Sequence, residues 1–512
     1  MLESAKTHPG GGTWPDGRRL GVADGYSSIP FYESFGNDYL ARQAEIESNA
    51  RSYPRKLPIA LRRGRGVFVE DTDGRQYIDC LAGAGALALG HNHPVVVEAI
   101  RDALAQEPVL QTLDLPTPLK DRFTRELFDS LPEAFAKDFK IQFCGPSGAD
   151  AIEAAFKLVK TATGRRGLLT FGGAYHGMTH ATLGVTGEPA PRRAVSGLGG
   201  EVQFLPFPSD YRCPFGVGGA AGAEIGANYI EFLLDDPNSG VLPPAAMILE
   251  PVQGEGGVVP APDAWLERIR EITRARAIPL IVDEVQTGLG RTGRLYAFEH
   301  AGIIPDVVVL SKAVGGGLPL SVVVYHRDLD QWKPGAHAGT FRGNQLAFAT
   351  GAATIRHVVE EGLGEHAERM GLRLMRGLEA VAADFPCIGH VRGRGLMIGA
   401  EIVEARDARD GAPPPSPELA RGVQHECLRR GLIVELGGRF GAVVRFLPPL
   451  VVAPQEIDAI LERFHSAVSA LRGVDAASRR LEDSAAVGFC DRALSDRTES
   501  FDRPEFAQTK EC

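Results

Sequence analysis

The chain has 512 residues and a formal net charge of −10 at pH 7, with 44% hydrophobic and 23% charged residues. This is the composition of a globular protein that is long enough for a large core and two subdomains. The acidic balance excludes the basic surface of a nucleic-acid-binding protein, and no apolar run approaches the roughly 20 residues of a membrane helix. We therefore expect neither nucleic acid nor a membrane as a partner.

Two further features of the composition concern the compartment and the thiols. The N-terminal stretch MLESAKTHPGGGTWPDG lacks the apolar segment of a secretion signal, so we expect a cytoplasmic protein. The cysteines are odd in number and form no C-x-x-C pair, which favours reduced thiols over a disulfide framework or a zinc site. They are Cys80, Cys144, Cys213, Cys387, Cys427, Cys490 and Cys512. We accordingly predict no metal site.

Composition and pattern divide the chain into five parts. Residues 1–27 are rich in glycine, proline and polar side chains, and residues 474–512 are charged and weakly periodic, so both ends are expected to be disordered. Between them we expect an N-terminal segment (28–90) that packs with the small domain, a large domain (91–346) and a small C-terminal domain (347–473).

The predicted elements begin with a hairpin over Phe68–Cys80, where Asp73-Gly74 supplies the turn. Short apolar strands then alternate with helical patterns such as 148–160 and 265–276. The strands are expected at 141–144, 167–171, 202–206, 245–252, 279–285 and 306–310. Such alternation predicts an α/β fold, in which a mainly parallel sheet is flanked by helices on both sides.

Beyond residue 347 the pattern changes. A helical pattern over 350–383 precedes short strands, and a last helix closes the domain at 455–471. The strands are expected at 396–403, 432–436 and 442–447. The C-terminal part is therefore predicted to be a smaller α+β domain.

Polar residues follow the predicted parallel strands at the edge where such sheets bind ligands. Asp283 ends one strand and Lys312 follows the next. A lysine there is partly desolvated, which favours the neutral amine that forms an imine with an aldehyde. A carboxylate one crossover away can keep a proton on a pyridine nitrogen. Together these two groups indicate pyridoxal phosphate chemistry.

The same edge offers an anion site and an aromatic side chain. The sequence GPSGADA opens the predicted helix at Gly148, where free N–H groups and the helix dipole favour a phosphate. Tyr175, in GGAYHG, can stack on an aromatic ring. Each residue also has a plain structural interpretation, as a cap, a loop or a packing residue, and the combination is what favours a site.

Two other motifs have weaker functional interpretations. His91 and His93, in HNHP, are two residues apart, and a turn capped by histidine is favoured over metal ligation. The glycine-rich GVGGAAG stretch (216–222) does not follow the G-x-G-x-x-G spacing after a strand, which disfavours a dehydrogenase.

The segment IVDEVQTGLGRTGRLYAFEHAGIIPDVVVLSKAVGGGLPL closely resembles the signature of class III aminotransferases, which have the fold-type I pyridoxal phosphate architecture. The similarity runs from about residue 39 to 472. It implies that Lys312 bonds to the cofactor aldehyde and shuttles the proton, and that Asp283 pairs with the pyridine nitrogen. Val285 would pack on the ring face opposite Tyr175, and Gln286 would reach the ring hydroxyl.

The resemblance also implies a shared active site. Gly148 and Ala149 would hold the phosphate through backbone amides, and Thr340, in GTFRGN, would bind the phosphate of the neighbouring subunit's cofactor. We therefore expect a homodimer. Arg445 resembles the arginine that binds an α-carboxylate, and Glu255 the glutamate that pairs with it when an ω-amine is bound; an ordinary structural ion pair is the alternative.

Met178 departs from a pattern in this family, because several ω-aminotransferases carry an arginine there; this disfavours ornithine-type substrates. Stretches such as DYRCPFGVGG and RGLIVELGGRFGAVVRFLPPL resemble the diaminobutyrate-specific group of the family. The implied reaction moves the 4-amino group of L-2,4-diaminobutyrate reversibly to 2-oxoglutarate. The alternatives are another ω-amine (4-aminobutyrate, ornithine or a polyamine), an aminomutase, and a catalytically silent cofactor-binding partner protein.

Overall fold

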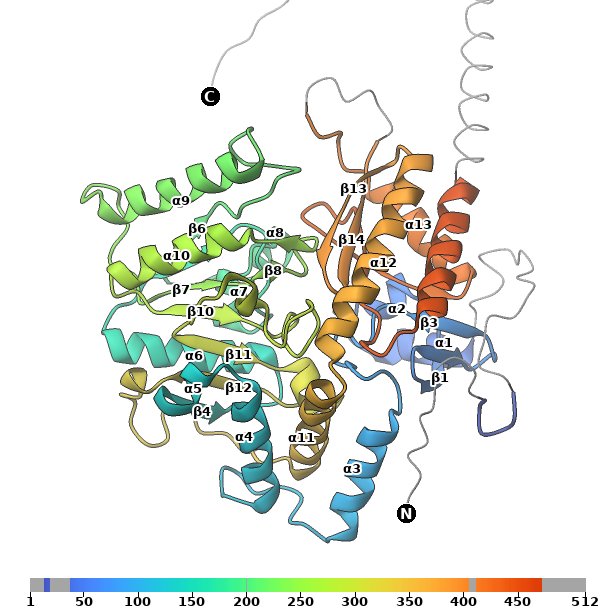
Figure 1. Ribbon diagram of the computed structural model, residues 1–512, viewed down its shortest axis with the longest axis horizontal. Helices are drawn as coiled ribbons and strands as arrows, with labels where there is room; N and C mark the ends of the chain where they lie inside the picture. Colours follow the sequence, from blue (N-terminus) through green and yellow to red (C-terminus); the bar gives the residue numbers. More distant parts are fainter. Residues whose placement is uncertain (1–12, 19–36, 199, 405–410, 472–512) are drawn as a thin grey trace, which may run out of the picture.

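The computed structural model describes residues 13–18, 37–198, 200–404 and 411–471. They form a large lobe around a seven-stranded sheet and a smaller lobe around a four-stranded sheet, side by side (Figure 1). The expected α/β architecture, with a smaller α+β part, is confirmed. Within these described ranges, no helix is both long enough and apolar enough to cross a membrane.

The large sheet has the strand order β4-β12-β11-β10-β7-β5-β6. In that order the strands are Phe139–Phe143, Val322–His326, Val307–Leu310, Leu280–Asp283, Ala246–Leu249, Leu168–Phe171 and Val202–Leu205. All are parallel except β12, which runs antiparallel to both of its neighbours. Sequence reasoning missed β12, because the glycine-rich stretch before it reads as the start of a helix or loop rather than as a turn back into the sheet.

Helices cover both faces of the large sheet. Along β7, Ile248 packs in a core with α6 (Gly148–Thr163), whereas Met247 and Leu249 face a second core with α10 (Asp263–Ala275). Alternation of this kind, with both sets apolar, is what a sheet buried on both faces requires. The other elements of this lobe are α3 (Pro94–Ala105), α4 (Pro118–Ser130), α5 (Glu133–Asp138), α7 (His180–Val185), α8 (Pro189–Arg193), α9 (Gly219–Asp235), η1 (Ala297–Ala301), η2 (Lys312–Gly315) and η3 (Arg327–Leu329).

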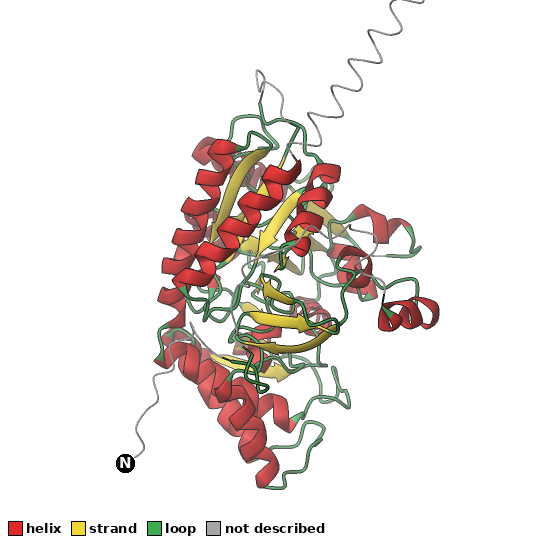
Figure 2. Cartoon of the chain, turned by 90° about the vertical axis from the view of Figure 1, so that its right-hand side faces the viewer, coloured by secondary structure: helices red, strands yellow, loops and turns green. Residues whose placement is uncertain are grey.

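The small lobe is built on an antiparallel sheet with the order β13-β14-β17-β16. Its strands are Ile388–Arg394, Met397–Ile402, Val443–Phe446 and Glu435–Gly437. Long helices lie along it, as Figure 2 shows. These are α12 (Leu363–Asp384), α13 (Pro417–Arg429) and a helix over 454–471. A two-stranded ribbon of β8 (Val252–Gln253) and β9 (Val259–Pro260) lies in the chain between the β7 strand and α10.

The N-terminal segment joins the C-terminal lobe through a third sheet, of order β1-β2-β3-β15. Its strands are Leu61–Arg65, Phe68–Asp71, Gln76–Asp79 and Leu432–Ile433, and β3 pairs with β15 in parallel. The predicted hairpin is present as β2 and β3, and Gly74 takes a φ of +85° in its turn. Two short helices precede it, α1 (Asp38–Ile46) and α2 (Tyr53–Lys56).

Some predicted boundaries differ from the structure. The helical pattern over 350–383 is two helices, α11 (Gln345–Glu360) and α12, separated at Gly362, which has a left-handed φ of +60°. The helix α11 packs against α3 and α4. Of the ends expected to be disordered, 474–512 and most of 1–27 lie outside the described residues; residues 13–18 form a turn in which Trp14 is buried against Arg63.

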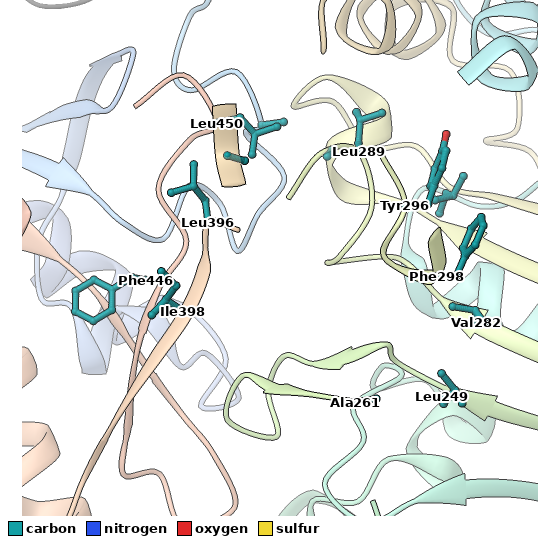
Figure 3. Close-up of a cluster of buried hydrophobic side chains, with 14 of the residues drawn as sticks. Leu249, Ala261, Val282, Leu289, Tyr296, Phe298, Leu396, Ile398, Phe446 and Leu450 are labelled. Atoms are coloured by element: carbon teal, nitrogen blue, oxygen red, sulfur yellow. The ribbon is translucent and has the colours of Figure 1, made fainter. Parts of the chain in front are cut away.

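One apolar core runs through both lobes. Leu249, Val282 and Phe298 of the large lobe belong to the same buried cluster as Ile398 and Phe446 of the small lobe. Figure 3 shows Leu289 and Leu450 between the two groups. Because this core is continuous, the lobes have a defined relative position at the edge of the large sheet where the polar residues lie.

The glycine run after Lys312 provides a test of packing. Gly316 has a φ of +62°, and a Cβ there would lie 2.6 Å from the carbonyl oxygen of Thr350. Gly302 has nearly the same φ, +61°, with no atom within 4 Å of its added Cβ. A left-handed alanine costs about 1–2 kcal/mol at either position. Gly316→Ala is therefore expected to lower the free energy of unfolding more than Gly302→Ala, measured by urea denaturation; equal losses would contradict this packing.

Candidate active site

The candidate site lies at the carboxyl ends of β10 and β11. Asp283 is the last residue of β10, and Lys312 follows β11 after Ser311. The two strands are parallel neighbours, with Asp283 paired to Val309, so the carboxylate and the lysine share one edge of the sheet. Lys312 has a φ of +49°. Such a left-handed conformation is strained for a residue with a Cβ, and strain of this kind is concentrated at functional sites.

The surroundings of Lys312 favour a neutral amine. Burial lowers the pKa of Lys312 below the ordinary value for lysine, and the nearby Arg445 guanidinium adds to the effect. The carboxylates of Glu255 and Asp283 oppose it. A larger neutral fraction is what an amine needs in order to act as a nucleophile or a base.

Asp283 is held in one orientation. It is 5% exposed, its Oδ2 lies 2.8 Å from Nδ1 of His176, and its Oδ1 accepts a hydrogen bond from the backbone N–H of Val285 at 3.1 Å. Sequence reasoning did not select His176, although it stands beside Tyr175 in the AYHG motif. Because one oxygen contacts a histidine and the other a backbone amide, this buried carboxylate is held in one orientation at the edge of the sheet.

Glu250 organises another part of the site; its position at a strand end is visible in the sequence, but no role was predicted for it. Its Oε1 accepts a hydrogen bond from the backbone N–H of Tyr175, and its Oε2 one from that of Gly254, both at 2.9 Å. Burial raises the pKa of Glu250 to about 7, and the Asp283 carboxylate contributes to this rise. Glu250 thus ties the loop that carries Tyr175 to the loop that carries Glu255.

The N-terminus of α6 forms a further part of the site. A Cβ on Gly148 would lie 3.0 Å from Cγ1 of Val285 and 3.7 Å from Cβ of Ser311, the residue before Lys312. Next to it, Ala149 fills the space that a side chain on Gly177 would need, at 2.6 Å. A glycine at 148 lets the first turn of this 16-residue helix lie against Val285 without a tight contact. The arrangement fits a phosphate bound by free N–H groups at the helix start.

A buried arginine cluster lies on the small-lobe side. Arg445 is fully buried; its Nη1 donates to Oε1 of Glu255 at 2.6 Å and lies 3.4 Å from Oε2 of Glu435. Its Nη2 donates to Oε1 of Gln286 at 2.9 Å. Burial alone would raise the pKa of Glu255, but the adjacent Arg445 guanidinium lowers this pKa below the ordinary value.

The structure therefore brings together most of the residues predicted from the sequence. Contacts or close charges connect Lys312, Asp283, Gly148, Ala149, Tyr175, Val285, Gln286, Arg445 and Glu255 around one site. Tyr175 and Val285 are both half-buried. Thr340 is exposed on the loop before α11, so its expected role toward a neighbouring subunit stays a prediction.

Among the described residues, one group has the composition of a metal site. Ligand atoms of Cys144, Asp150 and His337 lie within 4.8 Å of one another. However, Asp150 already accepts hydrogen bonds from the backbone of Gly145 and from His337, and burial raises the pKa of the Cys144 thiol well above its ordinary value. We assign no metal there.

The chain belongs to the aminotransferase class-III family, whose model matches residues 49–468. Enzymes of this family use pyridoxal 5′-phosphate, and the lysine, the carboxylate and the helix N-terminus described above fit the aldehyde, the pyridine nitrogen and the phosphate of that cofactor. The chain is thus a pyridoxal-phosphate-dependent aminotransferase of fold type I.

Two individual relatives make the similarity more specific than the family alone. The chain is 57% identical over 424 residues to the diaminobutyrate–2-oxoglutarate aminotransferase of Rhizobium meliloti (strain 1021), covering 82% of this chain and 90% of the relative. It is 50% identical over 439 residues to the protein of the same name from Haemophilus influenzae, covering 85% and 96%.

Solved structures of related enzymes share the fold. A thermostable omega transaminase from Pseudomonas jessenii matches with a TM-score of 0.76 and 27% identity, over 85% of this chain and 98% of that one. The ornithine aminotransferase of Toxoplasma gondii matches with a TM-score of 0.72 and 26% identity, over 85% and 95%, and that structure has pyridoxal phosphate at its active site in partial occupancy.

The close approach at Gly148 yields a prediction about the cofactor. Gly148→Ala brings a methyl to 3.0 Å from the Val285 side chain, so the helix start or Val285 must shift, and the variant is expected to retain pyridoxal phosphate less well, measured as cofactor released on dialysis. Gly164→Ala, at the other end of α6, has no atom within 4 Å of its Cβ and serves as the control. Equal retention in both variants would show that the phosphate does not bind at this helix start.

Proposed function

We propose that the chain moves the 4-amino group of L-2,4-diaminobutyrate to 2-oxoglutarate, giving aspartate 4-semialdehyde and glutamate, in a reversible reaction. The two relatives at 57% and 50% identity carry the name of this activity. The observation that carries the proposal is the 2.6 Å pair between Arg445 and Glu255 beside the half-buried Lys312. That pair suits an enzyme that accepts an ω-amine in one half-reaction and an α-keto acid in the other.

Bound pyridoxal phosphate supplies an aldehyde that links to amines and a ring that stabilises negative charge on the amine-bearing carbon. Lys312 would hold this aldehyde through its amine. Its Nζ would also be the group that takes the proton from the amine-bearing carbon of the donor and returns it, as general base and then general acid. The lowered pKa of Lys312 keeps part of the amine neutral for the first of these proton transfers.

Asp283 holds the proton on the pyridine nitrogen. Its carboxylate is kept in position by His176 and by the backbone of Val285, so little reorganisation is needed when negative charge develops nearby. Gln286 accepts a hydrogen bond from Arg445 and donates one to the backbone oxygen of Ala84, so its amide is held in one orientation beside the arginine, where it would be available to the ring hydroxyl. Tyr175 and Val285 would enclose the ring from its two faces.

Arg445 and Glu255 select between the two substrates. With Glu255 engaged, the guanidinium is neutralised and the pocket accepts the chain of an ω-amine. When Glu255 turns away, Arg445 is free to bind the α-carboxylate of 2-oxoglutarate or glutamate in a bidentate contact. Glu255 is the partner with room to move, because 34% of its side chain is exposed while the side chain of Arg445 is fully buried.

Replacing the lysine tests the proposal. Lys312→Ala is expected to reduce glutamate formation from L-2,4-diaminobutyrate and 2-oxoglutarate by more than about 10⁴-fold, because both the covalent link and the proton shuttle are lost. Circular dichroism should match the wild type, and Lys157→Ala, an exposed lysine on α6, should keep full activity. Substantial turnover by Lys312→Ala would refute the assignment.

We also infer a cytoplasmic homodimer in which Thr340 reaches the cofactor of the partner subunit. The support is an exposed apolar surface on the loop between α3 and α4: Val109, Leu110, Leu113 and Leu115 are all more than half exposed. Phe341, beside Thr340, is 65% exposed, and a bridge between Gln111 and Asn344 connects the two segments. A large exposed apolar patch of this kind marks an interface.

Charge placed on this surface is expected to weaken the dimer. The wild type should have twice the chain mass of 54.8 kDa by light scattering. Leu115→Asp should shift the protein toward monomer and lower activity, because Thr340 no longer reaches a partner site. Phe232→Asp changes an equally exposed side chain on α9, 64% exposed, and should leave the mass unchanged. A monomeric, fully active wild type would contradict the shared site.

A further inference from the structure

Arg445 has a second carboxylate neighbour that the substrate-selecting pair does not use. Glu435 is 3% exposed and stands directly across from Arg445 in the register of β16 and β17. Its Oε2 lies 3.4 Å from Nη1 of Arg445, the same nitrogen that donates to Glu255 at 2.6 Å. Two carboxylates therefore share one guanidinium, and one negative charge is left over when Glu255 is engaged.

The two carboxylates are unequally compensated. The shorter contact of the guanidinium is with Glu255. Burial would raise the pKa of Glu255, but Arg445 lowers this pKa below the ordinary value. Burial raises the pKa of Glu435, and although Arg445 opposes this, the Glu255 carboxylate adds to the rise. By these distances Glu435 is the less compensated of the two carboxylates.

The neighbouring groups of the same chain do not fully compensate the charge of Glu435. The hydroxyl of Tyr53 on α2 hydrogen-bonds to Glu435, which is a neutral contact. Lys56, also on α2, is close enough to lower the pKa of Glu435 slightly, but it is an exposed lysine whose charge is screened by water. Among the described residues, the buried cation that Glu435 contacts is Arg445, which it shares with Glu255.

Glu435 belongs to a charged cluster beside Lys312. The charges of Glu255 and Arg445 act on Lys312, and that of Glu435 acts on Tyr175. Arg445 contacts both glutamates, so Glu435 is part of the same cluster as the two groups that act on the lysine. A donor that reacts through one amine at Lys312 extends its other end toward this cluster.

We propose that Glu435 determines specificity for an amine donor that carries an ammonium group at its far end. This inference rests on the proposed function, and it identifies the residue that would distinguish the diamine donor from other ω-amines. L-2,4-diaminobutyrate and 4-aminobutyrate differ only in the 2-ammonium group. The excess negative charge of the cluster attracts the zwitterionic end of the first and repels the bare carboxylate of the second.

The test compares these two donors in wild type and Glu435→Gln, with 2-oxoglutarate as acceptor. Glu435→Gln should lower kcat/KM for L-2,4-diaminobutyrate by about tenfold or more, mainly through KM, and leave 4-aminobutyrate within about threefold. A purely structural residue would lower both donors in parallel, and that outcome would overturn the proposal. Glu435→Asp keeps the charge and should largely restore the preference for the diamine.

A matched control is available in the same lobe. Glu401 is another buried glutamate bonded to arginines, with Arg212 at 2.5 Å and Arg392 at 2.8 Å. Glu401→Gln removes the same charge from β14, where the register partner on β17 is Val443 rather than Arg445, and should leave the ratio of the two donors at the wild-type value. A loss of preference in Glu401→Gln equal to that in Glu435→Gln would also overturn the proposal.

A further test uses the wild type with a substrate analogue, so it does not depend on whether a variant folds. L-4-amino-2-hydroxybutyrate replaces the 2-ammonium by a hydroxyl of similar size, so it should be used about tenfold less well than the diamine. Equal use of the two would show that the charge is not recognised. If the wild type does not use L-2,4-diaminobutyrate at all, the proposed function fails; if it does and Glu435→Gln keeps the ratio, this inference alone fails.

Discussion

Burial of charge between the two lobes is the constraint on which the site depends. Arg445, Asp283 and Glu250 are almost entirely removed from water, and each has partners at short distances. In such surroundings a carboxylate or a guanidinium must be compensated, and the pKa of an amine shifts toward its neutral form. The chemistry of Lys312 follows from that environment rather than from the lysine alone.

The fold produces this environment by bringing three distant parts of the chain together. The parallel strands carry Asp283 and Lys312 to one edge, the N-terminus of α6 closes that edge at Gly148, and β17 brings Arg445 from the small lobe. A continuous apolar core across both lobes holds these parts in fixed positions relative to one another (Figure 3). The site is consequently a property of the interface between lobes, and changes in lobe packing would act on it directly.

Much of this could be predicted from local pattern. The parallel strands of the large sheet, the hairpin at Gly74 and the helix at Gly148 follow from apolar periodicity and from glycine positions, and the strand-end rule by itself selects Asp283 and Lys312. The resemblance adds roles for Arg445 and Glu255. The strands β12 and β13 were missed; β12 returns antiparallel directly after the glycine run, so the alternation of strand and helix does not predict it.

The amino-acid sequence was sufficient for the fold class, the cofactor chemistry and the lysine and carboxylate that serve it, because each follows from the order of residues along one or two neighbouring strands. It could not indicate His176 or Glu435 as members of the site, nor the role of Glu250. Their importance lies in contacts with residues up to 107 positions away, such as that of His176 with Asp283, or across a strand pair, as between Glu435 and Arg445. Buried charges are compensated in three dimensions, and no spacing along the chain records which carboxylate an arginine will meet.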